Sequence, residues 1–448
     1  MNEKNDLTIG NVKKTMLKFV LPYLLSCFLQ TFYGMADLFV VGLYNGPQTT
    51  TAVSVGSQVM HMLTVIIVGL AMGTTVRIAR AVGAKDAKDA GETIGTSVVF
   101  FAIVAVVLVV VLLVATRGIT TIMMTPEEAV QETNRYLLIC FAGIPFITAY
   151  NVISSIFRGA GDSKSPMVFV AIACVVNVVM DFVFIGGFRL GAAGAALGTV
   201  TGQMVSVLAS LVVLRKMKFG FAVKRKELRI KRGTLTAILR VGVPVAMQDG
   251  LIQIAFIVIT IIANSRGLIA STGVGIVEKL ISFMFLVPSA FLSAISSITA
   301  QNMGAGKPER ARESLRFGLL ITVSWGILCC LYCQFFPQTL VGLFTTEQAV
   351  VVAGSAYLRP YSMDCIFAAV HFCFSGYFCG DQKSGISFLH NIVSILAVRI
   401  PGAYFASRFF PESLFPMGLA APLGSLLSAV ICIAFYMYFR KREKGLTH

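Results

Sequence analysis

Long blocks of continuous apolar sequence divide the chain into about twelve segments, each roughly 20 residues or longer, which is enough for a helix to cross a bilayer. Only helices and closed barrels satisfy backbone polar groups inside a bilayer, and barrel strands alternate apolar and polar residues. Because these blocks do not alternate, they predict membrane-spanning α-helices. The composition agrees, since only 13% of the residues are charged, whereas soluble domains carry roughly 25%.

Twelve helices are expected, an all-α integral membrane fold. Their predicted positions are 15–43, 52–80, 93–116, 134–157, 167–188, 191–214, 236–264, 270–299, 314–337, 352–378, 386–408 and 417–439. The first block is too long for the apolar core of a cleavable signal peptide, so it is interpreted as the first membrane helix.

Most of the 37 Lys and Arg residues lie at the termini and in the connections on one side of these helices. The largest group falls in the segment 215–235. Short loops rich in Lys and Arg stay in the cytoplasm, so both termini and this segment are expected there. The absence of a targeting sequence is consistent with a prokaryotic inner membrane. This distribution accounts for the net charge of +16 without nucleic-acid binding.

The two halves of the chain repeat at an offset of about 220 residues, as in many transporters. The aligned segments are RAVGAKDAKDAGE (80–92) with QNMGAGKPERARE (301–313), RGAGDSKS (158–165) with YFCGDQKS (377–384), and Pro22 with Pro244. An even number of helices in each half makes the repeat parallel. We predict an N-terminal lobe (1–214), a cytoplasmic basic linker (215–235) and a C-terminal lobe (236–448), which favours a secondary transporter.

Two aspartates, Asp37 and Asp181, fall within predicted helices. At 1.5 Å per residue, both should lie at matching depth in the outer half of the membrane. An ionisable group at that depth is costly and therefore indicates function. Asn177 precedes Asp181 by four residues, so the two share one helix face and the amide can hydrogen-bond the carboxylate in either protonation state.

Four motifs occur in a specific order and spacing. They are LPYLLSCFLQTFYGMADLFVVG (21–42), the connections at 83–86 and 304–307, RGAGDSKSP (158–166) and NVVMDFVFIGGFRLGAAGAALGT (177–199). Together they resemble the multidrug and toxic compound extrusion (MATE) family, within the multidrug, oligosaccharidyl-lipid and polysaccharide exporter superfamily. The resemblance spans essentially the whole chain. It implies two six-helix lobes facing each other around a V-shaped central cleft, and export coupled to inward flow of H⁺ or Na⁺.

The resemblance also implies a cation-coupling site in the N-terminal lobe. It assigns Asp37 and Asp181 to this site and adds Asn177, Tyr136 and Thr199 to the same polar network. H⁺ or Na⁺ is the expected coupling ion, with Na⁺ possible at Asp37, Asp181 and Asn177. No other metal and no cofactor is expected.

The C-terminal lobe does not duplicate this site, because the repeat offset places Ile259 opposite Asp37 and Ile400 opposite Asp181. Another branch of the family carries carboxylates on helices 7 and 10. Here the helix 7 position holds Ile252. In helix 10, Asp364 lies about two residues from the position at which that branch carries its carboxylate, and residues two apart point to different sides of a helix. Coupling is therefore expected in the N-terminal lobe, which favours H⁺ over Na⁺.

The substrate is expected in a large, mostly apolar cavity between the lobes. Candidate lining residues are Met35, Gln253, Glu278, Phe283 and Asp364. Glu278 has two interpretations, contact with a cationic substrate or pairing with Arg399. Pro22 is a candidate hinge in helix 1, because proline removes a backbone hydrogen bond and favours a kink. A static kink is the alternative.

These features predict a secondary active antiporter that exports small organic compounds, cationic or amphipathic, by alternating access. The alternative is a flippase or exporter of a lipid or lipid-linked glycan, for which only Lys279, Arg399 and Arg359 are candidate internal cations. An enzyme is disfavoured because the four histidines supply no catalytic pair or metal-ligand spacing. The expected partners are a small-molecule substrate and the lipid bilayer, without nucleic acid, and the sequence implies no particular oligomer.

Overall fold

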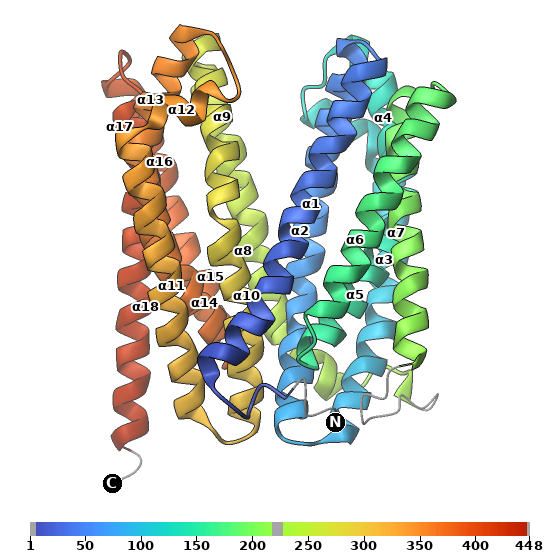
Figure 1. The fold of residues 1–448 in the computed structure, drawn as a ribbon, viewed down its shortest axis with the longest axis vertical. Helices are drawn as coiled ribbons and strands as arrows, with labels where there is room; N and C mark the ends of the chain where they lie inside the picture. The colour runs from blue at the N-terminus through green and yellow to red at the C-terminus, as the bar shows by residue number, and fades with distance from the viewer. Residues whose placement is uncertain (1–5, 217–226, 446–448) are drawn as a thin grey trace. The chain divides into compact units, whose positions relative to one another are not determined.

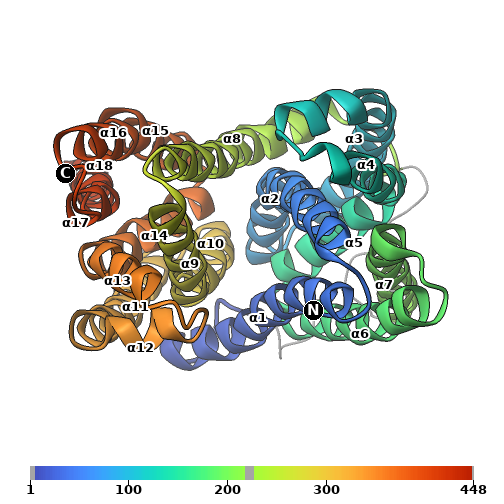
Figure 2. The same ribbon diagram turned by 90° about the horizontal axis from the view of Figure 1, so that it is seen from above.

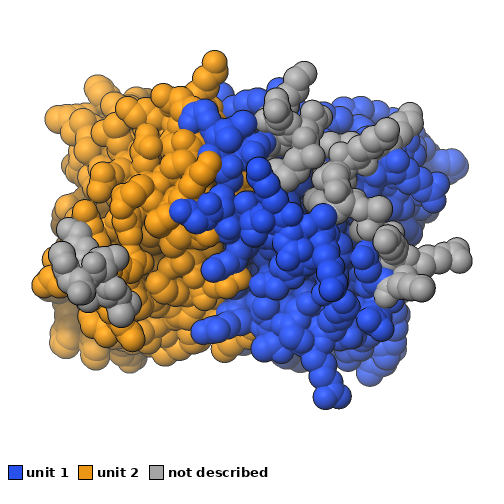
Figure 3. Space-filling view, turned by 90° about the horizontal axis from the view of Figure 1, so that it is seen from below, with its two compact units in different colours: residues 1–10, 17–242, 304–306 blue, residues 11–16, 243–303, 307–448 orange. Residues whose placement is uncertain are grey.

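The computed structural model describes residues 6–216 and 227–445, and in these ranges every regular element is a helix (Figure 1). The predicted linker 215–235 therefore lies partly outside the described residues. The helices pack into two compact units, coloured separately in Figure 3. Unit 1 comprises residues 1–10, 17–242 and 304–306, and unit 2 comprises residues 11–16, 243–303 and 307–448.

Unit 1 is built mainly from the helices before the basic segment. They are α1 (Val12–Tyr44), α2 (Pro47–Gly83), α3 (Ala87–Ile122), α4 (Glu127–Ala142), α5 (Ile144–Gly159), α6 (Lys164–Asp181), the π-helix η2 (Phe182–Gly187) and α7 (Gly191–Lys216). Seen end on, α2 lies beside α5 within this unit (Figure 2). Its apolar core includes Val41, Val53, Phe141 and Ile144, all essentially buried.

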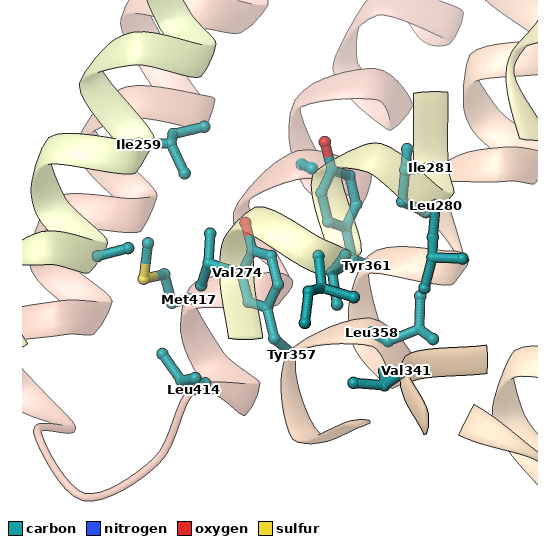
Figure 4. Close-up of a cluster of buried hydrophobic side chains, with 14 of the residues drawn as sticks. Ile259, Val274, Leu280, Ile281, Val341, Tyr357, Leu358, Tyr361, Leu414 and Met417 are labelled. Carbon is teal, nitrogen blue, oxygen red and sulfur yellow. The ribbon is translucent and has the colours of Figure 1, made fainter. Parts of the chain in front are cut away.

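Unit 2 contains the remaining helices and most of α8. They are α8 (Arg232–Asn264), α9 (Leu268–Met284), α10 (Leu286–Gly304), α11 (Pro308–Phe335), α12 (Pro337–Gly342), α13 (Gln348–Ser362), α14 (Asp364–Gly380), α15 (Ser384–Ser394), the π-helix η4 (Ile395–Arg399), α16 (Ile400–Phe409), α17 (Phe415–Gly418) and α18 (Ala420–Gly445). Within this unit α14 packs against α11 and α18. Figure 4 shows part of the largest apolar cluster, in which Tyr357 and Tyr361 project among Val274, Ile281 and Leu358.

The number of membrane spans agrees with the sequence. Ten helical segments, some made of two consecutive helices, are long and apolar enough to cross a membrane. Two further pairs of helices are each bent at a short break, and the total is twelve if each bent pair is one span. These pairs are 127–159, bent by 47°, and 348–380, bent by 43°. Twelve helices were predicted, and each predicted range overlaps one of these spans.

The two bends occupy equivalent places in the repeat and have local causes. Pro145 lies in the first turn of α5, directly after the break at Gly143, and Pro360 lies just before the break at Met363. Proline lacks the amide hydrogen that would continue the preceding helical ladder. The sequence predicted one helix over each pair, 134–157 and 352–378, with a kink favoured at Pro145.

The division between the units falls within α8, at Gly242. The first turns of α8 belong to unit 1 because glycines allow close backbone contact there. A Cβ on Gly73 would overlap the Ile238 carbonyl, and one on Gly242 would overlap the Leu70 carbonyl. Such contacts require the absence of a side chain.

Candidate functional site

Asp37 and Asp181 are buried acids within the membrane-spanning helices of unit 1. Asp37 lies in the second half of α1, and Asp181 ends α6 where the π-helix η2 begins. Their exposed fractions are 3% and 0%. Neither makes an ion pair with any residue that the structure describes.

Side chains from α6 and α7 surround the Asp37 carboxyl. The Thr199 hydroxyl donates a hydrogen bond to Asp37 Oδ2 at 3.1 Å. Asp181 and Asn177 also interact with the Asp37 carboxyl. The structure therefore brings together four of the five residues predicted for the cation site, one from α1 and three from the much later helices α6 and α7.

Glycine at 198 makes this approach possible. A Cβ at that position would overlap Asp181 Oδ1, and a Cβ on Gly202 would press against Ala173 and Asn177. The small-residue face of α7 thus lets α6 pack closely and leaves room for the acid. Gly198 is a site residue that the sequence showed only as part of the motif 177–199.

Several polar atoms of this cluster are buried without a hydrogen-bond partner among the residues that the structure describes. They are Asp37 Oδ1, both carboxyl oxygens of Asp181 and both terminal side-chain atoms of Asn177. Buried polar groups are normally paired, because an unpaired one keeps its desolvation cost. Two neighbouring carboxylates without a cation are still more costly, so the pair favours binding a proton or a cation. Its oxygen atoms are also the type of ligand that hard cations prefer.

Tyr136, the fifth predicted residue, borders the cluster on α4. Its ring packs over Gly56, and its hydroxyl lies 3.2 Å from the Ser57 hydroxyl. It interacts electrostatically with Asp37 rather than by a described hydrogen bond. Ser57 was not predicted, and a serine within an apolar helix gave no signal of its own.

Unit 2 contains a different polar cluster around Arg399. The guanidinium lies 4.0 Å from Asp364 Oδ2, donates a hydrogen bond to the Tyr361 hydroxyl at 2.6 Å and lies over the Phe256 ring at 5.1 Å. Glu278 also interacts electrostatically with Arg399, and one of its oxygens accepts a hydrogen bond from Thr260 at 3.4 Å. Asp364 is fully buried, whereas Glu278 is partly exposed.

The other predicted substrate residues lie on separate helices. Met35 of α1 is exposed, whereas Gln253 of α8 and Phe283 of α9 are partly buried. Met35 belongs to unit 1 and the other two to unit 2, so a shared cavity stays a prediction. Pro22 lies within α1, which is helical without a break from Val12 to Tyr44.

Comparison with known proteins places the chain in a family. The MatE family model matches residues 22–183 and again residues 244–405, which agrees with the predicted repeat. The chain is 28% identical over 442 residues to "Probable multidrug resistance protein YpnP" of Bacillus subtilis, covering 98% of each. It is 24% identical over 421 residues to the multidrug export protein MepA of Staphylococcus aureus, covering 93% of this chain and 91% of MepA.

Solved structures share the fold. A transporter of the MOP superfamily from Pyrococcus furiosus matches with a TM-score of 0.92 at 21% identity, covering 100% of this chain and 99% of the other. The two matches of the family model cover more than half of this chain. The chain is therefore a multi-pass membrane protein that belongs to the MATE family of transporters.

Proposed function

We propose that this chain is an antiporter that exports small cationic or amphipathic organic compounds in exchange for a cation bound at Asp37 and Asp181. The observation that carries the proposal is the pair of buried acids in unit 1 that has no ion-pair partner among the described residues. A Lys or Arg side chain beside the acids would neutralise them permanently. Acids without such a partner can instead bind and release a cation from solution. The names of the relatives YpnP and MepA, which refer to multidrug resistance and export, support this substrate class.

The exchange follows from the surroundings of the two acids. When the site faces outward, Asp37 and Asp181 take up the cation, and the charge of the pair falls. Thr199 is then free to change its partner, because its hydrogen bond to Asp37 depends on that charge. The packing of α1 against α6 and α7 changes as a result, and the substrate leaves.

The driving force is sufficient for export. Moving one elementary charge across 100 mV supplies about 2.3 kcal/mol. Every 1.4 kcal/mol corresponds to about a tenfold ratio of concentrations. For a substrate without net charge, one or two protons therefore support gradients of roughly tenfold to thousandfold, whereas a singly charged cation needs two protons for one net charge to move.

H⁺ is the preferred coupling ion in this proposal. Among the described residues, the Asp37 carboxyl contacts one threonine and one amide besides Asp181. Such a small set of oxygen ligands binds a proton as readily as a metal ion, since hard cations such as Ca²⁺ take 6–8 oxygens.

The charge distribution of the sequence supports cytoplasmic termini in a prokaryotic inner membrane.

For the substrate, Glu278 is the best placed acid of unit 2. It is partly exposed, and its Oε1 has no hydrogen-bond partner among the described residues. The ammonium group of a substrate would supply that partner. Met35, Gln253 and Phe283 would contact the apolar remainder of the molecule.

Efflux from liposomes tests the proposal. Purified protein is reconstituted, and export of a fluorescent cationic dye is followed under a pH gradient and, separately, under a Na⁺ gradient. Wild type is compared with Asp37→Asn, Asp181→Asn and the control Glu128→Gln, an exposed acid at the start of α4. We expect the pH gradient to drive efflux in wild type and the control only.

Each other outcome has a defined meaning. Transport driven only by Na⁺ would change the ion assignment and keep the site. Unchanged transport in both aspartate variants would overturn coupling at this site. If no dye moves under either gradient, the substrate class is wrong, and lipid-linked substrates become the next assay.

A further inference from the structure

The two units differ in whether their buried acids lie beside a basic side chain. Unit 1 holds Asp37 and Asp181 without an ion-pair partner among the described residues, whereas unit 2 holds Asp364 together with Arg399. This difference in charge occurs at corresponding places of the repeat. Each unit has a π-helix in the fifth of its six predicted helices. Asp181 directly precedes η2, and Arg399 ends η4.

A local cause positions Arg399. Pro401 lies in the first turn of α16, directly after η4. Because proline lacks an amide hydrogen, the ladder cannot continue regularly, and the wider π-turn accommodates the gap. Gly424 of α18 lies beside Ser394, whose hydroxyl a Cβ at this position would crowd, and within van der Waals contact of the Arg399 Cβ. The arginine is thereby held in the interior with an exposed fraction of 9%.

The surroundings of the guanidinium resemble a cation-binding site more than a closed salt bridge. Arginine and carboxylate normally approach to about 2.7–2.9 Å, often through two parallel hydrogen bonds. Here the shortest distance to Asp364 is 4.0 Å, and the short contact is the one from the guanidinium to the Tyr361 hydroxyl. The Phe256 ring covers one face of the guanidinium, which adds attraction for any cation.

Polar atoms around the guanidinium lack partners. Both carboxyl oxygens of Asp364 and Oε1 of Glu278 have no hydrogen bond among the described residues, and neither has Nε of Arg399. Asp364 is fully buried, so its oxygens require a nearby positive charge. Arg399 supplies it and stays protonated in proteins.

We propose that Arg399 is a resident cation. Its guanidinium occupies a monovalent-cation site built by Asp364, Tyr361, Phe256 and Glu278, so that unit 2 exchanges no coupling ion. The side chain is tethered, which gives it an effective concentration that a free cation in solution does not easily match. Asp364 and Glu278 carry two negative charges, and Arg399 neutralises one of them. One negative charge therefore remains, at Glu278, to bind the substrate. This last step rests on the proposed function, whereas the cation site does not.

The test removes the resident cation and supplies a free one. All variants carry Asp37→Asn and Asp181→Asn, so that unit 1 cannot contribute. The parent is compared with Arg399→Ala, with Arg399→Lys, which keeps the charge, and with Arg399→Ala combined with Asp364→Asn. Binding of guanidinium at millimolar concentration, and of Na⁺, is measured by thermal shift and calorimetry, with choline as the control for ionic strength.

We expect saturable binding of guanidinium to Arg399→Ala that is at least about tenfold tighter than to the parent, to Arg399→Lys or to the combined variant. Recovery of folded Arg399→Ala only in buffers with guanidinium would support the proposal equally. The proposal is overturned if Arg399→Ala is folded and shows the same response to guanidinium as to choline. It is also overturned if the parent binds guanidinium as tightly, or if neither arginine-free variant folds with guanidinium present. None of these results depends on coupling in unit 1, which the liposome assay tests separately.

Discussion

At the scale of single residues, one hydroxyl connects α7 to the acid of α1. The Thr199 hydroxyl donates to Asp37 Oδ2, and such a bond stabilises the ionised carboxylate. Thr199→Val removes it and keeps the shape. A hydrogen bond to a charged group contributes roughly 1.5–3 kcal/mol. Because proton binding becomes easier without the bond, we expect half-maximal proton-driven transport to move to higher pH by about one unit.

The matched control is Thr199→Ser, which keeps the hydroxyl and should keep the wild-type pH profile. Initial rates of dye efflux across a pH series measure the shift. A profile for Thr199→Val identical to that of wild type would remove Thr199 from the coupling network.

Gly198 permits a second test at this scale. The added methyl group of Gly198→Ala would overlap Asp181 Oδ1 and displace the carboxyl from Asp37. Because small displacements of functional groups cost up to about a hundredfold in rate, we expect transport to fall at least about tenfold. Gly118→Ala in α3 is the control, since its Cβ would meet nothing within 4 Å. Equal activity of the two variants would contradict the close approach.

How much of the site could be predicted depended on the kind of residue. Asp37 and Asp181 were visible because charges in apolar blocks are rare and costly. Thr199 and Tyr136 required the family resemblance, because hydroxyls are common in membrane helices. The sequence could not decide which acid pairs with Arg399, because spacing along the chain does not show which acid a buried base approaches. The structure places Asp364 within 4.0 Å and Glu278 farther away.

At the scale of elements, all twelve spans could be predicted because apolar length alone defines a membrane helix. Prolines within them indicated kinks but not full breaks. Pro145, Pro288 and Pro401 fall inside predicted helices, where each favours a kink, and in the structure each lies near the start of a helix after a break. Proline at a first turn and proline within a helix give the same signal in an apolar block.

Pro22 differs, because α1 continues through it. Pro22→Ala restores a backbone hydrogen bond and stiffens the helix that carries Asp37. We expect the thermal midpoint in detergent to rise by on the order of 2 °C, while transport falls. Pro244→Ala, the repeat equivalent in α8, is the control and should leave proton-driven transport closer to wild type. If Pro22→Ala transports as well as the control, bending at Pro22 is not needed.

At the scale of the whole molecule, the chain is a duplicated unit whose two copies have diverged in charge. The family model matches both halves, beginning at Pro22 and at Pro244, so the helices have kept their repeat. The buried acids of unit 1 have no equivalent in unit 2, where Ile259 and Ile400 stand at the repeat positions and Arg399 is adjacent. Duplication therefore preserved the spans and changed the interior, which supports the proposal that cation exchange takes place in unit 1.

Proton release on substrate binding tests this account most directly. Purified wild-type protein in weakly buffered solution is mixed with saturating cationic dye, and released protons are counted with a pH indicator. If the acids of unit 1 exchange their protons for substrate, wild type should release about one proton per dye bound, the linkage expected of coupled sites. The variant carrying Asp37→Asn and Asp181→Asn should bind dye and release none. Equal proton release from wild type and this variant would contradict coupling at Asp37 and Asp181.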